Sequence, residues 1–144
     1  MNKEENQDPI AMYIILRESL LEEMTVGKQV AAGAHASQEL QRQYGKLDTR
    51  YNAHENNMSP AYMSDAELAR YWLYYDWLKE GVRKIVLRAN DKEWSKLKEE
   101  FKNEMVIIRD AGYTCVEPGS EVSIGLWPRR KSMRSKLLKG LQVL

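Results

Sequence analysis

The chain has 144 residues, of which 43% are hydrophobic and 30% are charged, as is typical of one globular domain with its own core. Cys115 is the sole cysteine, which excludes an intrachain disulfide, and the charged N-terminal residues do not resemble a signal peptide. Because no apolar run reaches the ~18 residues that span a membrane, we expect a cytoplasmic protein.

The formal net charge of +1 hides an uneven distribution. Glu121 is the last acidic residue, and the segment after it contains six basic residues: Arg129, Arg130, Lys131, Arg134, Lys136 and Lys139. A basic end of this kind suits a polyanionic partner, although a solvated terminal helix would show the same pattern.

At the start of the chain, polar residues 1–9 predict a disordered tail. Residues 12–16 (MYIIL) are a short apolar run of β-formers, which predicts a buried strand. Thr25 can cap a helix over residues 26–44, and Gly45 is expected to end it. The small residues within this helix indicate that another element packs closely on its backbone, or that a ligand approaches it.

Residues 46–63 show no periodicity, which predicts a long inserted loop. A capping box at Ser64 opens a further helix that Gly81 ends. Its expected inner face consists of Leu68, Tyr71, Trp72, Tyr75 and Leu78. Tyr74 and Trp77 point partly away from that face, so they need a cover, either the inserted loop or a second copy of the protein. We expect a homodimer, because symmetric dimers are the commonest assembly.

The second half of the chain alternates strands and helices. Strands are predicted at residues 84–87, 105–108 and 122–126, and Asn90 caps a helix between the first two. A basic helix ending at Gly140 follows the last strand. This pattern predicts an α/β fold in which helices cover both faces of one sheet.

Several motif fragments are incomplete. Gly27-Lys28 lacks the other residues of a phosphate-binding loop, and His54-Glu55 lacks the second histidine of a zinc-protease helix. Two histidines and one cysteine are too few for a structural zinc site. We therefore expect no metal and no cofactor, and a structural role for Cys115.

Two short segments carry candidate site residues. Lys28 lies in the first turn of a helix that follows a strand, where unpaired N–H groups and a basic side chain together attract an anion. His35 is two turns further along and shares this face. Asp110 ends a strand shortly before Thr114, and a carboxylate there can orient or deprotonate a water molecule. The alternatives are a surface lysine, a histidine with satisfied hydrogen bonds, and a turn aspartate that bonds its own backbone.

The same segments resemble a known family. The run DAGYTCVEPGS at residues 110–120, followed by Gly125 and Pro128, resembles the signature of the type 2 peptidyl-tRNA hydrolases. The segment GKQVAAGAHA at residues 27–36 is similar to a helix of that family, with lysine and histidine in register.

The resemblance spans residues 12–144 except residues 46–70, which look like an insertion. It implies a single domain over residues 10–144 with a three-layer α/β fold, a mixed four-stranded sheet with helices on both faces, often assembled as a dimer. The activity it implies is hydrolysis of the ester that joins a peptide to the terminal ribose of tRNA.

The resemblance implies that Lys28, Asp110 and Thr114 are catalytic. Asp110 would position a water molecule and accept its proton during attack on the ester carbonyl, and Lys28 would stabilise the oxyanion or hold the terminal phosphate. Thr114 would orient Asp110 or the water. Polar residues of the family pattern are replaced by apolar or small residues at three places: Ala32, Gly33-Ala34 and Val122.

We expect His35, Lys84 and Ser120 to contact the substrate. The tRNA backbone is expected to lie on the basic residues Arg129, Arg130, Lys131 and Arg134. Two other functions stay open. One is a non-catalytic RNA- or protein-binding module that retains the fold, and the other is an interaction protein that uses its aromatic helix as the contact surface.

Overall fold

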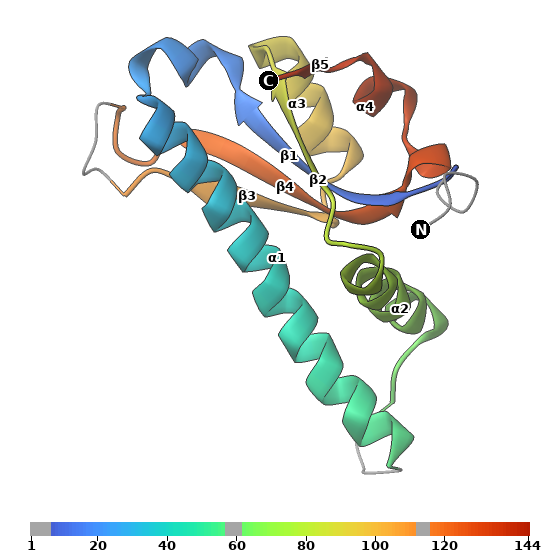
Figure 1. The fold of residues 1–144 in the computed structure, drawn as a ribbon. Coiled ribbons are helices and arrows are strands. Elements are labelled where there is room, and N and C mark those ends of the chain that lie inside the picture. Colours follow the sequence, from blue (N-terminus) through green and yellow to red (C-terminus); the bar gives the residue numbers. More distant parts are fainter. Residues whose placement is uncertain (1–6, 57–61, 112–115) are drawn as a thin grey trace.

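The computed structural model describes residues 7–56, 62–111 and 116–144. They form one five-stranded mixed sheet with helices on both faces (Figure 1). The strand order is β3-β4-β1-β2-β5, with β1 (Ile10–Arg17), β2 (Lys84–Ala89), β3 (Met105–Arg109), β4 (Glu121–Arg130) and β5 (Gln142–Val143). β1 is parallel to β2, whereas β4 is antiparallel to both β1 and β3.

The sheet follows the apolar runs of the sequence. β1 is buried from Ile10 to Leu16, because helices cover both faces of the sheet. The predicted α/β class is confirmed, with one difference: the sheet has five strands instead of four. The additional strand, β5, pairs with the end of β2. It has two residues and is too short to show a pattern in the sequence.

The described residues form four α-helices: α1 (Val26–Glu55), α2 (Asp65–Lys79), α3 (Asp91–Glu100) and α4 (Lys136–Gly140). The first three begin where their capping residues predict. The Thr25 hydroxyl accepts a hydrogen bond from Lys28 N at 3.2 Å, and complete capping boxes follow Ser64 and Asn90.

α1 does not end where the sequence predicts. Gly45 lies inside the helix, so the loop expected over residues 46–63 is wrong for residues 46–55. Glycine costs a helix interior only about 1 kcal/mol relative to alanine. Packing offsets this cost, because Tyr44 and Tyr51 stack on tyrosines of α2, each pair with ring centroids 4.3 Å apart.

The buried face of α2 also differs from the predicted one. Tyr71, Tyr74 and Trp77 are buried, whereas Trp72 and Leu78 are 42% and 43% exposed. The predicted orientation of Tyr74 and Trp77, partly away from the inner face, is wrong because it assumes that the sheet alone covers this helix. α2 packs against both α1 and the sheet, so part of the insertion serves as the cover.

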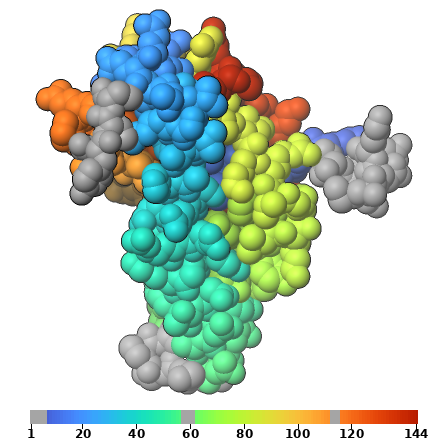
Figure 2. All heavy atoms as spheres, turned by 60° about the vertical axis from the view of Figure 1, so that its left-hand side comes forward, coloured from blue at the N-terminus to red at the C-terminus, as the bar shows by residue number. Residues whose placement is uncertain are grey.

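Helices α1 and α2 lie on one face of the sheet, and α3 and α4 lie on the other (Figure 1). The C-terminal half of α1 extends past the sheet and forms a projecting helical pair with α2 (Figures 1 and 2). The 3-10 helices η2 (Glu18–Glu23) and η3 (Lys131–Met133) follow β1 and β4. Of the helices in the described ranges, none has the length and apolar character needed to cross a membrane.

Candidate active site

Two of the predicted catalytic residues meet at one edge of the sheet. Lys28 Nζ lies 2.7 Å from Asp110 Oδ2, so the two side chains form an ion pair. The Asp110 side chain is fully buried, while that of Lys28 is 23% exposed. A partly exposed ammonium can hold the carboxylate and still offer an N–H donor to a second oxygen atom.

The turn before β4 holds the Asp110 backbone in place. Asp110 N donates a hydrogen bond to Ser120 O at 2.8 Å, and Asp110 O accepts one from Gly119 N at 2.9 Å. Gly119 has a φ of +83°, a conformation that glycine adopts without strain. The turn at Pro118-Gly119 therefore fixes where the backbone of Asp110 lies.

A β-bulge at this end of β4 places two consecutive side chains of the strand against α1. The register of β3 and β4 shifts between Ile108 and Arg109, because β4 carries Val122 as an extra residue. Val122 and Ser123 consequently both face α1. Val122 packs in a cluster with Ala32, and Ser123 Oγ donates a hydrogen bond to Ala32 O at 2.8 Å.

The small residues of α1 allow it to approach the sheet closely. Ala32 and Ala36 are buried, and a Cβ atom on Gly125 of β4 would lie 3.0 Å from side-chain atoms of Leu40 and Val106. Close packing on another element, one of the two predicted causes of the small-residue segment, is therefore confirmed.

Ser120, another candidate, contacts the backbone of Asp110, because its main-chain oxygen accepts the hydrogen bond from Asp110 N. His35 is exposed on α1. Thr114 lies outside the described residues. Within residues 7–56, 62–111 and 116–144, no group of three or more His, Cys, Asp or Glu side chains could hold a metal ion.

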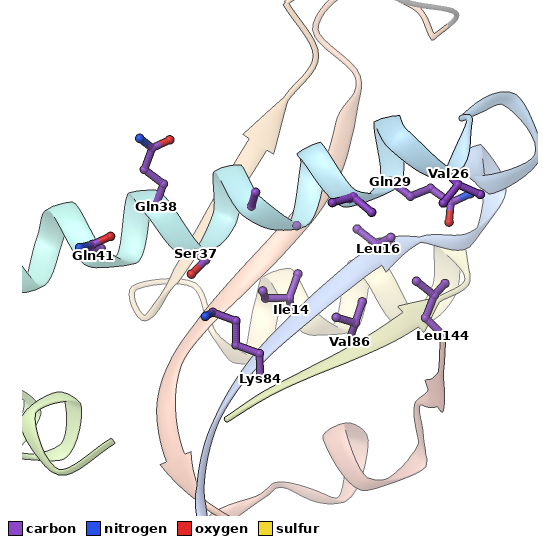
Figure 3. A pocket seen from close by; sticks show the side chains of 13 residues that line it. Ile14, Leu16, Val26, Gln29, Ser37, Gln38, Gln41, Lys84, Val86 and Leu144 are labelled. Atoms are coloured by element: carbon purple, nitrogen blue, oxygen red, sulfur yellow. The ribbon is translucent and has the colours of Figure 1, made fainter. Parts of the chain in front are cut away.

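Lys84 lies at the opposite end of the sheet from the ion pair. Lys84 is the first residue of β2 and pairs with Met12 near the start of β1. β3 runs in the same direction as β1, because both are antiparallel to β4. Asp110 follows the last residue of β3 and therefore lies at the other end of the strands. Lys84 stands beside a largely apolar groove of about 540 Å³ between α1 and strands β1 and β2 (Figure 3). The structure therefore does not bring Lys84 together with Lys28.

The four predicted tRNA-binding residues lie at the far end of β4. Arg129 and Arg130 belong to this strand, and Lys131 and Arg134 lie in or beside η3, so strand and turn replace the first part of the predicted basic helix. Lys131 is exposed. Arg129 is half-buried, with its guanidinium carbon 4.8 Å from the ring centroid of Phe101.

A buried carboxylate that the sequence alone does not single out lies behind the ion pair. Glu121, paired in the sheet with Arg109, accepts hydrogen bonds at 2.9 to 3.0 Å from Trp94 Nε1, Lys98 Nζ and Arg109 Nη2. Burial alone would raise the pKa of Glu121, but the bonds from Lys98 and Trp94 and the nearby positive charges hold it below its ordinary value. Because Arg109 directly precedes Asp110, this network fixes the end of β3.

Comparison with known proteins places the chain in a family. Residues 10–144 match the family model of the peptidyl-tRNA hydrolase PTH2, and both partners of the ion pair lie within the match. The chain belongs to the peptidyl-tRNA hydrolase PTH2 family.

Curated relatives agree with this assignment. The chain is 40% identical to the peptidyl-tRNA hydrolase of Methanococcus maripaludis over 74 residues, which cover 47% of this chain and 62% of that protein. It is 30% identical to the peptidyl-tRNA hydrolase of Methanococcus vannielii over 137 residues, covering 91% of this chain and 96% of the relative. The corresponding protein of Methanocaldococcus jannaschii is 28% identical over 137 residues, covering 92% and 98%. The chain thus spans about three fifths of the length of its Methanococcus maripaludis relatives and nearly all of the other two.

Proposed function

We propose that the protein hydrolyses the ester bond between a peptide, or an N-blocked amino acid, and tRNA, and so recycles tRNA. The observation that carries the proposal is the Lys28–Asp110 ion pair, which is buried at its carboxylate and open to solvent at its ammonium. Membership of the PTH2 family and the names of the relatives support the same activity.

The proposed reaction needs only modest catalysis, because an aminoacyl ester is already reactive. Asp110 positions a water molecule and accepts its proton as the water attacks the ester carbonyl. Carboxylates are weak bases at neutral pH, so positioning contributes more than basicity. Lys28 keeps Asp110 in place and donates a hydrogen bond to the oxyanion that develops, or holds the terminal phosphate. Thr114 orients Asp110 or the water.

We further propose that tRNA contacts the basic end of β4, that the protein is a homodimer, and that it acts in the cytoplasm. Basic residues near the chain end support the first, because phosphate contacts dominate the affinity for nucleic acids. The homodimer is supported by Trp72 and Leu78, which are exposed on α2 and offer an apolar surface for a second copy. They replace Tyr74 and Trp77, which are buried, as the candidate contact residues.

Release of free tRNA from N-acetylaminoacyl-tRNA tests the activity. We expect turnover by the wild type and its loss in Asp110→Asn, which removes the charge with little change in shape. Glu117→Gln is the matched control, since Glu117 is exposed in the adjoining turn and loses the same charge. Binding of tRNA without turnover would instead identify the non-catalytic module.

A further inference from the structure

A hollow of about 640 Å³ lies between α2 and the last residues of β4, far from the ion pair. β3 begins at Met105, which pairs with Leu126, so within the described residues β4 has no strand beside it on that side beyond Leu126. Arg70 of α2 and Arg129 of β4 both line this hollow. Both residues therefore border one space, with the Arg129 guanidinium carbon 4.8 Å from the ring centroid of Phe101 at the end of α3.

The Arg70 guanidinium is held rigidly at this hollow. Its central carbon lies 4.0 Å from the ring centroid of Trp127, and its Nη2 donates a hydrogen bond to Gln43 Oε1 at 2.8 Å. Trp127 Nε1 in turn donates to Arg70 O at 2.9 Å. These contacts hold helix α2 against strand β4 beside the Arg70 guanidinium.

Within the described residues, no carboxylate pairs directly with either arginine. Arg129 Nε donates to Trp127 O at 3.3 Å, and in the described part of the chain neither Arg70 nor Arg129 forms an ion pair. Two acidic residues line the hollow: Glu67 is engaged by Arg50, and Glu104 is exposed. Burial lowers the pKa of both arginines; the charge of Glu104 partly offsets this for both, and Tyr13 and Glu100 do so as well for Arg129.

We propose that this hollow binds a backbone phosphate of the tRNA through Arg70 and Arg129. The planar guanidinium presents paired N–H donors that match phosphate oxygens, and a bound anion would compensate two partly desolvated cations. The proposal rests on the proposed function for the identity of the RNA. It adds Arg70, which belongs to the projecting helical pair, to the RNA-binding surface.

The position of the hollow selects which part of the tRNA it meets. From Glu121, next to the ion pair, to Arg129 an extended strand spans about 26 Å at ~3.3 Å per residue. Along the axis of a duplex stem one strand carries a phosphate roughly every 3.4 Å, so this distance corresponds to about eight base pairs of stem. With the ester held at Asp110, we expect Arg70 to meet nucleotides that precede the terminal ones, where such a stem begins. Exposed Lys131 beside the hollow extends the basic surface along such a stem.

The test compares two substrates, N-acetylaminoacyl-tRNA and the N-acetylaminoacyl ester of a short trinucleotide that lacks the stem. We expect the wild type to prefer the full tRNA, and Arg70→Gln/Arg129→Gln to lose roughly tenfold of this preference in kcat/KM, about the effect of one charge-assisted contact. Arg42→Gln is the control for charge loss outside the hollow, since Arg42 is exposed on α1 and loses one of the two charges that the double variant loses. An equal loss on both substrates would overturn the proposal, as would an unchanged preference.

Direct tRNA binding separates this proposal from the enzymatic one. The salt dependence of tRNA affinity should become shallower by roughly 0.7–0.9 per lost phosphate contact in the double variant and stay unchanged in Arg42→Gln. This result is expected even if the wild type fails to hydrolyse any ester. Stabilisation of the wild type, but not of the double variant, by inorganic phosphate, together with equal tRNA affinities, would identify a site for a small free anion and overturn the assignment to RNA. Circular dichroism checks that both variants fold.

Discussion

The Ser123 hydroxyl donates a hydrogen bond to the main-chain oxygen of Ala32, 2.8 Å away, and both residues are buried. This bond ties the bulged part of β4 to α1 one helical turn after Lys28. The turn that leads into β4 binds the backbone of Asp110 on the other side. The two partners of the ion pair are therefore placed by one helix–sheet junction.

Removing one partner of the ion pair is expected to affect stability unequally. Lys28→Ala leaves a fully buried carboxylate without this cation, and such losses reach about 3–5 kcal/mol. Asp110→Ala leaves an ammonium that water can reach, so it should cost less, although both variants should lose most of their hydrolysis. Urea unfolding of both variants and of Lys28→Ala/Asp110→Ala measures this. The double variant should be more stable than Lys28→Ala, and the opposite order would argue against the ion pair.

Acid should weaken the Glu121 network. The pKa of Glu121 in the folded protein lies below its ordinary value of 4.5, so the unfolded state takes up the proton first as the pH falls. The stabilisation is fully present above pH 4.5 and is lost as the pH falls through the folded pKa. In unfolding experiments from about pH 7 to about pH 3, the wild type should therefore lose more stability than Glu121→Gln. Glu117→Gln, exposed nearby, should follow the wild type. Parallel curves for the wild type and Glu121→Gln would contradict the network.

Gly45→Ala should raise the free energy of unfolding by about 0.5–1 kcal/mol, because Gly45 lies inside α1 and nothing lies within 4 Å of an added Cβ atom. Gly81→Ala is the contrasting variant, since Gly81 has a φ of +111° and an alanine there is strained. Thermal unfolding distinguishes them: one Tm should rise and the other should fall. A lower Tm for Gly45→Ala would favour the loop that the sequence predicts.

Sedimentation at micromolar concentration tests the homodimer. We expect a dimeric wild type and a monomeric Trp72→Glu variant, because a charge on the exposed face of α2 would have to be desolvated in the interface. Lys92→Glu, at an exposed position on α3, should stay dimeric. A monomeric wild type would leave α2 covered by its own chain alone.

Local signals predicted most of this fold. Caps such as Thr25 and Ser64 fix helix starts through bonds within a few residues, so the sequence shows them directly. Lys28 and Asp110 were recognisable because a helix start and a strand end are both local features, and the structure joins them.

The features that sequence does not reveal depend on contacts between distant segments. Gly45 stays helical because tyrosines of α2 pack beside it, and the buried face of α2 depends on where α1 lies. The Glu121 network and the Arg70–Arg129 hollow each combine separate elements, so neither leaves a motif in one stretch of chain.

The continuity of α1 constrains how the chain can change in length. Lys28 lies near the start of this uninterrupted helix and Tyr51 lies near its end. The first part of the helix packs on the sheet, and the second part packs on α2. A single residue inserted between Ala36 and Tyr44 would rotate one part relative to the other by about 100° and turn either the lysine or the tyrosines away from their partners. Insertions and deletions are consequently expected to be tolerated beyond Glu55, where α1 ends, and to be excluded from the middle of the helix.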